Sequence, residues 1–154
     1  MERKKIEIVP YLPFNGNCED ALNTYISVFG GEISYMSHWS ESEYDVEPEQ
    51  RKKVLHAEFT IGNVRMAAGD NVDYIETTTD VRLMIHLDSK EEALRAIAVL
   101  REGGNVLLPF HQCPTPDAND CEAILTDRFG VTWIVTCPNT VSRTEGVENA
   151  TAKL

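Results

Sequence analysis

Hydrophobic and polar positions recur in the same order in the two halves of the chain. Each half begins with a strand, continues with a helix that ends at a glycine pair, and finishes with three strand-like runs. The predicted first strand and helix are Ile6–Phe14 and Asn17–Phe29 in one half, and Asp80–Leu87 and Ser89–Glu102 in the other. This repeated order predicts two copies of one βαβββ module.

The glycine spacing supports the repeat. The glycine pairs begin at Gly30 and Gly103, 73 residues apart, and a further glycine separates the last two runs of each half, at Gly62 and Gly130. A period of this length is too long for a solenoid unit. We therefore predict one α+β domain over residues 1–138, built from two tandem modules at about 5–75 and 80–138, with a polar C-terminal tail at 139–154.

Both predicted helices have recognisable ends and a buried face. Asn17 is a favourable N-cap for the first helix, and Ser89 with Glu92 has the spacing of a capping box at the second. Helical spacing predicts one buried face on each helix. The buried sets are Ala21, Leu22, Tyr25 and Phe29 in the first, and Ala93, Leu94, Ile97 and Leu100 in the second.

Alternation assigns the two faces of three strands, because successive strand side chains point to opposite sides. The helix-facing sets are predicted as Leu55, Ala57, Phe59 and Ile61; Val81, Leu83, Ile85 and Leu87; and Val131, Trp133 and Val135. The opposite sets are His56, Glu58 and Thr60; Arg82, Met84 and His86; and Thr132, Ile134 and Thr136. Such a mixed face is typical of a ligand-lining sheet and also of a solvent-exposed one.

Composition excludes several classes of protein. The chain of 154 residues is 42% hydrophobic and 25% charged, which is globular, and its formal charge of −11 argues against nucleic-acid or anionic-membrane partners. No apolar run approaches the ~20 residues of a membrane span, and no signal peptide is visible. We therefore expect a cytoplasmic protein with four reduced cysteines. The charged segment Ser40–Lys53 is predicted to be a solvated loop, or alternatively a lid with Tyr44 as its contact.

Three segments carry a family resemblance. Pro10–Glu32, Leu55–Gly62 and Thr126–Trp133 resemble, in order, signatures of the PhnB-like, 3-demethylubiquinone methyltransferase-like branch of the glyoxalase/bleomycin-resistance (vicinal oxygen chelate) superfamily. The resemblance implies a cup-shaped, partly open β-barrel with its helices packed outside, a small-molecule ligand in the cup, and a homodimer. One fold hosts unrelated chemistries, so the resemblance does not fix a reaction.

The resemblance also implies a divalent metal held by one residue from each of four strands. Those positions correspond here to Pro10, a residue between Met66 and Ala68, Arg82, and Ile134. These side chains offer none of the oxygen, imidazole or thiolate donors that divalent ions need. We therefore predict no metal and no cofactor. The sequence contains nothing that resembles the strand, glycine-rich loop and helix of a nucleotide-binding fold, so it does not support methyl transfer.

The remaining cup residues predict a small-molecule site with apolar walls and a few polar groups. The candidate ligand-binding residues are Leu12, Phe14, Met66, Ala68, Arg82, Met84, His86, Thr132 and Ile134. Arg82 would anchor an anionic or carbonyl-bearing ligand. Its alternative role is a buried ion pair with Asp70 or Glu58.

Three residues are candidates for acid–base catalysis. His86 is placed to titrate near neutral pH. His56 and Glu58 suggest a pair, but residues i and i+2 on a strand lie ~7 Å apart, which favours a structural role. Three functions stay open. They are metal-free small-molecule binding; a lyase, isomerase or dioxygenase with an unusual metal site made of His86, Glu58 and His56; and a drug- or metabolite-sequestering dimer.

Overall fold

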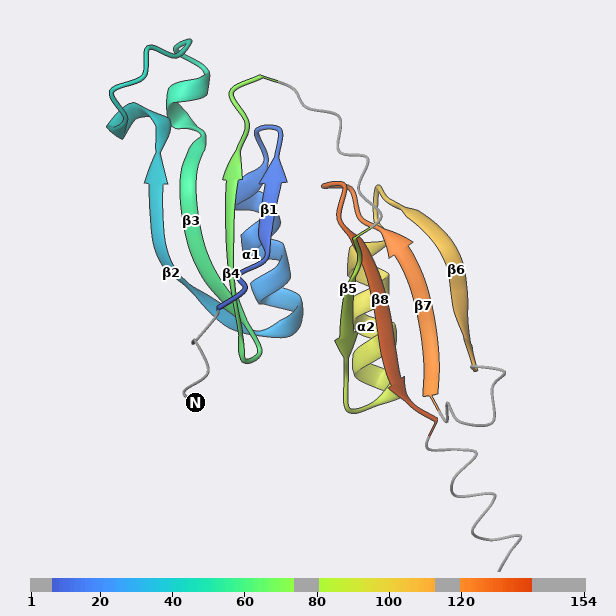
Figure 1. Ribbon diagram of the computed structural model, residues 1–154. Coiled ribbons are helices and arrows are strands. Elements are labelled where there is room, and N and C mark those ends of the chain that lie inside the picture. Colours follow the sequence, from blue (N-terminus) through green and yellow to red (C-terminus); the bar gives the residue numbers. More distant parts are fainter. Residues whose placement is uncertain (1–6, 74–80, 113–119, 140–154) are drawn as a thin grey trace, which may run out of the picture. The chain divides into compact units, whose positions relative to one another are not determined.

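A computed structural model describes residues 7–73, 81–112 and 120–139 (Figure 1). The chain divides into two compact units, Met1–Thr77 and Thr78–Leu154. The sheets have the strand orders β1-β4-β3-β2 and β5-β8-β7-β6, so each unit places its first strand at one edge, next to its last strand. This shared topology confirms the predicted repeat of a βαβββ module. The predicted tail lies outside the described residues, apart from Asn139.

The elements follow the predicted order. Unit 1 contains β1 (Tyr11–Phe14), α1 (Cys18–Phe29), β2 (Gly31–His38), β3 (Val54–Ile61) and β4 (Val64–Asp70). Unit 2 contains β5 (Leu83–His86), α2 (Lys90–Leu100), β6 (Asn105–Gln112), β7 (Asp120–Thr126) and β8 (Thr132–Pro138). The pairs β1–β4 and β5–β8 are parallel, and the other neighbours are antiparallel.

The first strand of each unit is shorter than predicted. β1 begins after Pro10, whose carbonyl accepts from the Ala67 N–H but which has no N–H of its own to continue the ladder. β5 ends at His86, although the Leu87 N–H still donates to the Thr136 carbonyl. Val81, predicted to face the helix, precedes β5 and is exposed. Strand ends are the least reliable part of a periodicity argument.

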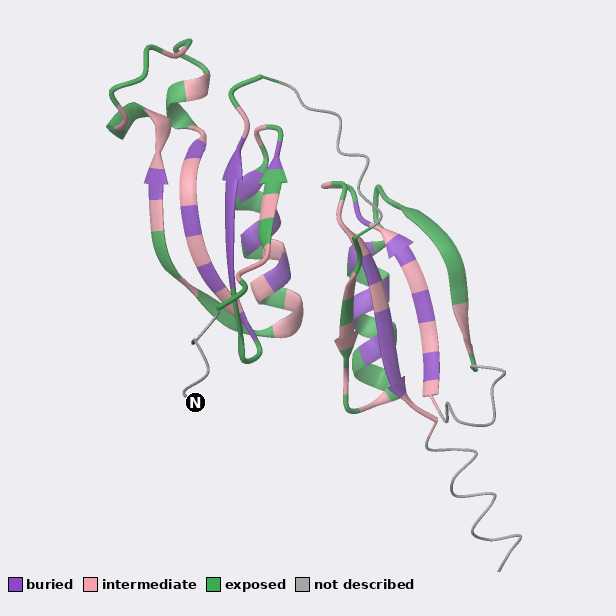
Figure 2. Ribbon diagram, viewed as in Figure 1, coloured by how far each residue is buried: buried purple, intermediate pink, exposed green. Residues whose placement is uncertain are grey.

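In each unit one helix covers one face of the sheet, and the core lies between them (Figure 1). Figure 2 shows buried residues alternating with less buried ones along β3 and β7. Ala57 and Phe59 are buried in β3, and Trp133 and Val135 in β8, as their alternation predicts. The other face of each sheet is left uncovered by the helix of its own unit.

The helix ends are partly as predicted. The Ser89 hydroxyl accepts from the Glu92 N–H at 3.2 Å, but the Glu92 carboxylate returns to the Asp88 N–H instead of that of Ser89. At α1, the Asn17 side chain makes no capping hydrogen bond. The Asp70 carboxylate at the end of β4 replaces it. Its Oδ1 accepts from the N–H groups of Gly16 and Cys18, at 2.8 and 3.0 Å.

The buried stripe of α2 is rotated from the predicted one. Leu94 is exposed, and Ala96 takes its place beside Ala93, Ile97 and Leu100. These four positions follow the i, i+3, i+4, i+7 spacing, whereas Leu94 lies at the edge of that stripe. The prediction of a buried Leu94 was therefore wrong, because periodicity alone does not fix how a helix is rotated against its sheet.

The segment Ser40–Lys53 includes parts of two short 3₁₀ helices, Trp39–Glu41 and Gln50–Lys52, and is anchored to the end of β4. The Trp39 indole N–H donates to the Asp70 carbonyl at 3.2 Å, and the Gln50 amide donates to the Asn71 carbonyl at 3.1 Å. Tyr44 packs edge-on against Trp39, with ring centroids 6.2 Å apart. The segment is thus an ordered part of unit 1, and Tyr44 contacts Trp39, the residue just before the segment.

Candidate functional site

Four of the predicted ligand-binding residues lie on the helix-covered face of the unit 1 sheet, and three of them are in its core. Because paired residues on neighbouring strands share a face, Leu12 and Ala68 lie on the same face as Ala57, and Met66 on the same face as Phe59. Phe14, two residues after Leu12, shares this helix-covered face. Phe14, Met66 and Ala68 are buried. The prediction that Leu12, Phe14, Met66 and Ala68 line an open face is therefore wrong.

The uncovered face of sheet β1-β4-β3-β2 instead carries an aromatic cluster. The Tyr11 ring stacks on His56, with centroids 6.1 Å apart and planes inclined by 20°. The Tyr35 ring also lies beside the His56 ring, with centroids 6.2 Å apart and planes inclined by 48°. Both tyrosines are about half exposed, at 51% and 52%. Sequence reasoning missed them, although placing Phe14 in the core would have left Tyr11 on this face.

A chain of ionic groups continues from the aromatic cluster. His56 Nε2 lies 3.8 Å from Glu58 Oε1, so the pair is closer than the ~7 Å expected from strand spacing. The side chains of His56 and Glu58 bend toward each other, although their Cα atoms keep the spacing of the strand. Glu58 Oε1 also lies 3.5 Å from Arg65 Nη2, and Arg65 Nε lies 3.8 Å from Glu7 Oε1. These groups are partly exposed, so each ion pair adds little stability.

The uncovered face of sheet β5-β8-β7-β6 holds the other predicted residues. Met84 pairs with Ile134 and His86 with Thr136 across β5 and β8, on the face opposite Trp133 and Val135. Thr132 shares that face and bonds Thr126 through its hydroxyl, at 2.9 Å. Met84 is 55% exposed. The structure thus brings Met84, His86, Thr132 and Ile134 together, as their alternation predicts.

Hydrogen bonds orient the His86 ring. Its Nδ1 lies 2.5 Å from the Thr136 hydroxyl, which in turn donates to the Ile85 carbonyl at 3.3 Å. The contact with Thr136 therefore holds the ring through Nδ1.

Arg82 is exposed and stands two residues before Met84. It takes part in none of the ion pairs within the described residues. The alternative, a buried pair with Asp70 or Glu58, stays a prediction, and both carboxylates already have partners in unit 1. The Asp70 carboxylate is satisfied by three backbone N–H groups of its own unit, and Glu58 by His56 and Arg65.

The residues at the superfamily's metal positions do not fit a divalent ion. On the uncovered faces these positions hold Ala67 beside Tyr11, and Ile134 beside Met84, while Pro10 and Arg82 flank the first strands. None supplies a donor for a divalent cation. Within residues 7–73, 81–112 and 120–139, no three His, Cys, Asp or Glu side chains are grouped as a metal site.

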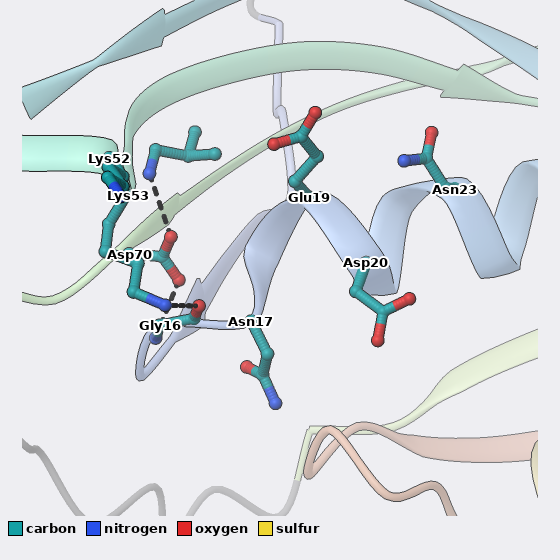
Figure 3. Close-up of a pocket in the computed structure, with 9 residues that line it drawn as sticks. Gly16, Asn17, Glu19, Asp20, Asn23, Lys52, Lys53 and Asp70 are labelled. Carbon is teal, nitrogen blue, oxygen red and sulfur yellow. Dashed lines mark hydrogen bonds between the residues drawn. The ribbon is translucent and has the colours of Figure 1, made fainter. Parts of the chain in front are cut away.

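A separate cavity of about 370 Å³ lies at the start of α1 (Figure 3). Figure 3 shows the Asp70 carboxylate turned toward Gly16, with its hydrogen bonds to the backbone N–H groups of Gly16 and Val54. The ammonium group of Lys53 donates to the Gly16 carbonyl at 2.8 Å. Glu19 and Asp20 also line the cavity. The positive end of the helix is therefore already neutralised, and the cavity does not favour an anionic ligand.

Comparisons with known proteins agree with this architecture. A family model described as 3-demethylubiquinone-9 3-methyltransferase matches residues 6–136. The crystal structure of PA1353 from Pseudomonas aeruginosa is 35% identical, covers 87% of this chain and 98% of its own, and gives a TM-score of 0.75. A putative 3-demethylubiquinone-9 3-methyltransferase, the PhnB protein of Bacillus cereus, is 25% identical, covers 86% and 99%, and gives 0.74.

More distant structures share the fold alone. The fosfomycin resistance protein FosX from Listeria monocytogenes is 12% identical, covers 88% of this chain and 94% of its own, and gives a TM-score of 0.58. No curated protein matches significantly. None of the described helices has the length and apolarity to cross a membrane. Since the family model spans residues 6–136 and PA1353 is 35% identical over 87% of the chain, the chain belongs to the 3-demethylubiquinone-9 3-methyltransferase family, the PhnB-like branch of the glyoxalase/bleomycin-resistance superfamily.

Proposed function

We propose that the protein binds a small organic molecule on the uncovered faces of its sheets, without a metal ion. The observation that carries this proposal is the cluster of Tyr11, His56 and Tyr35, in which each tyrosine ring lies against the His56 ring on a face that α1 does not cover. Aromatic rings give a ligand flat apolar contact, while Glu58 and Arg65 supply polar atoms beside them. This combination is typical of small-molecule sites.

Arg82 is the proposed anchor for an anionic or carbonyl-bearing group of the ligand. Its guanidinium stays charged at any working pH, is exposed, and offers a fork of donors that matches carboxylate and phosphate oxygens. On the same strand, the imidazole of His86 and the thioether of Met84 add one polar and one apolar contact. A ligand that uses Arg82 therefore also meets Met84 and His86.

The proposed form is a cytoplasmic homodimer. Members of the superfamily bind small-molecule ligands and are often dimers. The formal charge of −11 disfavours nucleic acids and anionic membranes as partners. A resistance-type protein that only sequesters its ligand is one form of this proposal.

A second candidate function is an enzyme of the lyase, isomerase or dioxygenase type. The contact between His56 and Glu58, 3.8 Å apart, favours it, since a carboxylate beside an imidazole can orient it as a base or metal ligand. We do not propose methyl transfer, despite the name of the family. Each sheet is mixed and four-stranded, and the loop between the first strand and the helix of each unit is not a glycine-rich nucleotide-binding loop.

The test is a thermal-shift screen of metabolites on the wild type and matched variants. A ligand should raise the Tm of the wild type, and the variant of the face that binds it, Tyr35→Ala in unit 1 or Arg82→Ala in unit 2, should lose that response. Arg95→Ala, which removes an exposed charge from α2, is the control and should respond like the wild type. Binding by the wild type that persists unchanged in both site variants would contradict the proposal.

Elemental analysis separates the two candidate functions. The proposed binding protein should purify without a stoichiometric divalent metal. About one zinc, nickel, manganese or iron per chain, lost in His56→Ala, Glu58→Ala or His86→Ala, would establish the enzyme with an unusual metal site instead.

A further inference from the structure

Two cysteines of unit 2 face each other across neighbouring strands. Cys121 in β7 is paired directly with Cys137 in β8, and both are buried on the helix-covered face. Directly opposed residues of an antiparallel pair have Cα atoms about 4.5–5.5 Å apart. This spacing lies within the range of roughly 4.4–6.8 Å that a disulfide spans. Both cysteines are free in the structure.

A cavity of about 340 Å³ gives solvent access to one member of this pair. Cys121 lines it together with Lys90, Phe110, His111 and Pro138. Cys121 is 8% exposed, and Cys137 behind it is 1% exposed. The Lys90 ammonium stands over the Phe110 ring, 6.0 Å from its centroid, at the wall of the cavity. A small molecule that enters this space therefore meets the sulfur of Cys121 first.

We propose that Cys121 and Cys137 form a reversible modification site, which a hydroperoxide entering this cavity converts into a cross-strand disulfide. In the first step the sulfur of Cys121 attacks the peroxide, the O–O bond breaks, and Cys121 becomes a sulfenic acid while an alcohol or water leaves. In the second step the sulfur of Cys137 attacks that of Cys121, the S–O bond breaks, and water leaves as the S–S bond forms. Two thiols lose two electrons and two protons, and the hydroperoxide is reduced.

The order of the two steps follows from the surroundings of each sulfur. Burial, reinforced by the neighbouring Cys121, raises the pKa of the Cys137 thiol, so Cys137 is the weaker nucleophile toward a peroxide. Cys121 is the member that a reagent in the cavity can reach. Cys18 shows the contrast, because it is fully buried in unit 1 and has no cysteine opposite it.

The test uses the full chain, treated with hydrogen peroxide. The free thiols should fall from four to two per chain, and the intact mass should decrease by two hydrogens. Dithiothreitol should restore both. Cleavage before Asp120 and after Arg128 places Cys113, Cys121 and Cys137 on three different peptides, so the linked partners can be read directly by mass spectrometry. A peptide pair joined through Cys121 and Cys137 is the expected result.

Two variants keep the result interpretable. Cys137→Ala should stop at the first step and leave Cys121 as a sulfenic acid that dimedone traps. Cys113→Ser should form the same Cys121–Cys137 link as the wild type. A link that uses Cys113 or joins two chains, over-oxidised Cys121 in the wild type with no link, or four unreacted thiols would each overturn the proposal.

Discussion

The indole N–H of Trp133 donates a 2.9 Å hydrogen bond to the carboxylate of Asp127, and both side chains are buried. The second carboxylate oxygen of Asp127 accepts from the N–H groups of Phe129 and Val131. One aspartate thus fixes the turn between β7 and β8 and supplies the partner that a buried indole needs. The largest side chain of the unit 2 core is therefore oriented by the turn that precedes its strand.

Trp133→Ala should lower the free energy of unfolding by ~3–5 kcal/mol, because it removes a large core side chain and strands a carboxylate oxygen. Trp133→Phe keeps most of the buried ring and should lose less. Urea titration of the three proteins measures both losses. Equal stability of Trp133→Ala and wild type would mean that the indole contributes nothing to the core.

Asp70→Ala should destabilise unit 1 by more than an ordinary N-cap substitution, which costs ~1 kcal/mol. It leaves three backbone N–H groups, those of Gly16, Cys18 and Val54, without their acceptor. Asp88→Ala removes an exposed aspartate before the other helix and is the control. Denaturant midpoints of the two variants should differ clearly. If the denaturant midpoint shifted no further for Asp70→Ala than for Asp88→Ala, water would be able to replace the Asp70 carboxylate as the acceptor of these three hydrogen bonds, and the prediction would be wrong.

Gly31→Ala and Gly104→Ala should both be strongly destabilising, because a Cβ at either of these matching positions of the repeat would collide with a strand carbonyl. A Cβ at Gly31 would lie 1.9 Å from the Thr60 carbonyl oxygen, and one at Gly104 would lie 2.2 Å from that of Thr126. Gly62→Ala meets no atom within 4 Å and costs only the left-handed backbone strain, ~1–2 kcal/mol. In thermal denaturation, the Tm of Gly62→Ala should therefore lie well above the Tm of the other two variants. If the Tm of Gly31→Ala or Gly104→Ala were close to that of Gly62→Ala, the predicted collision at that glycine would be wrong.

Stability should fall with rising pH in a way that depends on Cys18. Burial, with the nearby Asp70 and Glu19 carboxylates, raises the pKa of this thiol from 9.0 to about 12. The unfolded chain therefore releases the thiol proton first, so the thiol's contribution is complete below pH 9 and is lost progressively toward pH 12. Cys18→Ala should show a shallower decline between pH 8 and 10 than the wild type in parallel urea titrations. Parallel slopes would mean that other groups, such as Tyr11, govern this range.

Periodicity predicted the repeat and the faces of β3 and β8, because polar and apolar residues alternate cleanly there. It could not place β1, where Tyr11, Leu12, Pro13 and Phe14 are all apolar or aromatic. Only the pairing of Leu12 with Ala68 shows which side is covered. The aromatic cluster was missed because Tyr11, Tyr35 and His56 come from three strands, and the alternation within one strand does not show which residues of other strands lie beside it. The role of Asp70 as the cap of α1 was equally hidden, because it depends on a contact between distant residues.

That contact has a consequence for the order of folding. The start of α1 is held by a residue 52 positions after Cys18, so the helix cannot be completed by local sequence alone. While the chain is being synthesised, α1 must wait for β4, and β1 must wait for the same strand to become its only neighbour in the sheet. Contacts of this separation slow folding, since a long loop must close before they form. The arrival of β4 should therefore complete the sheet edge and the helix cap of unit 1 in a single cooperative step.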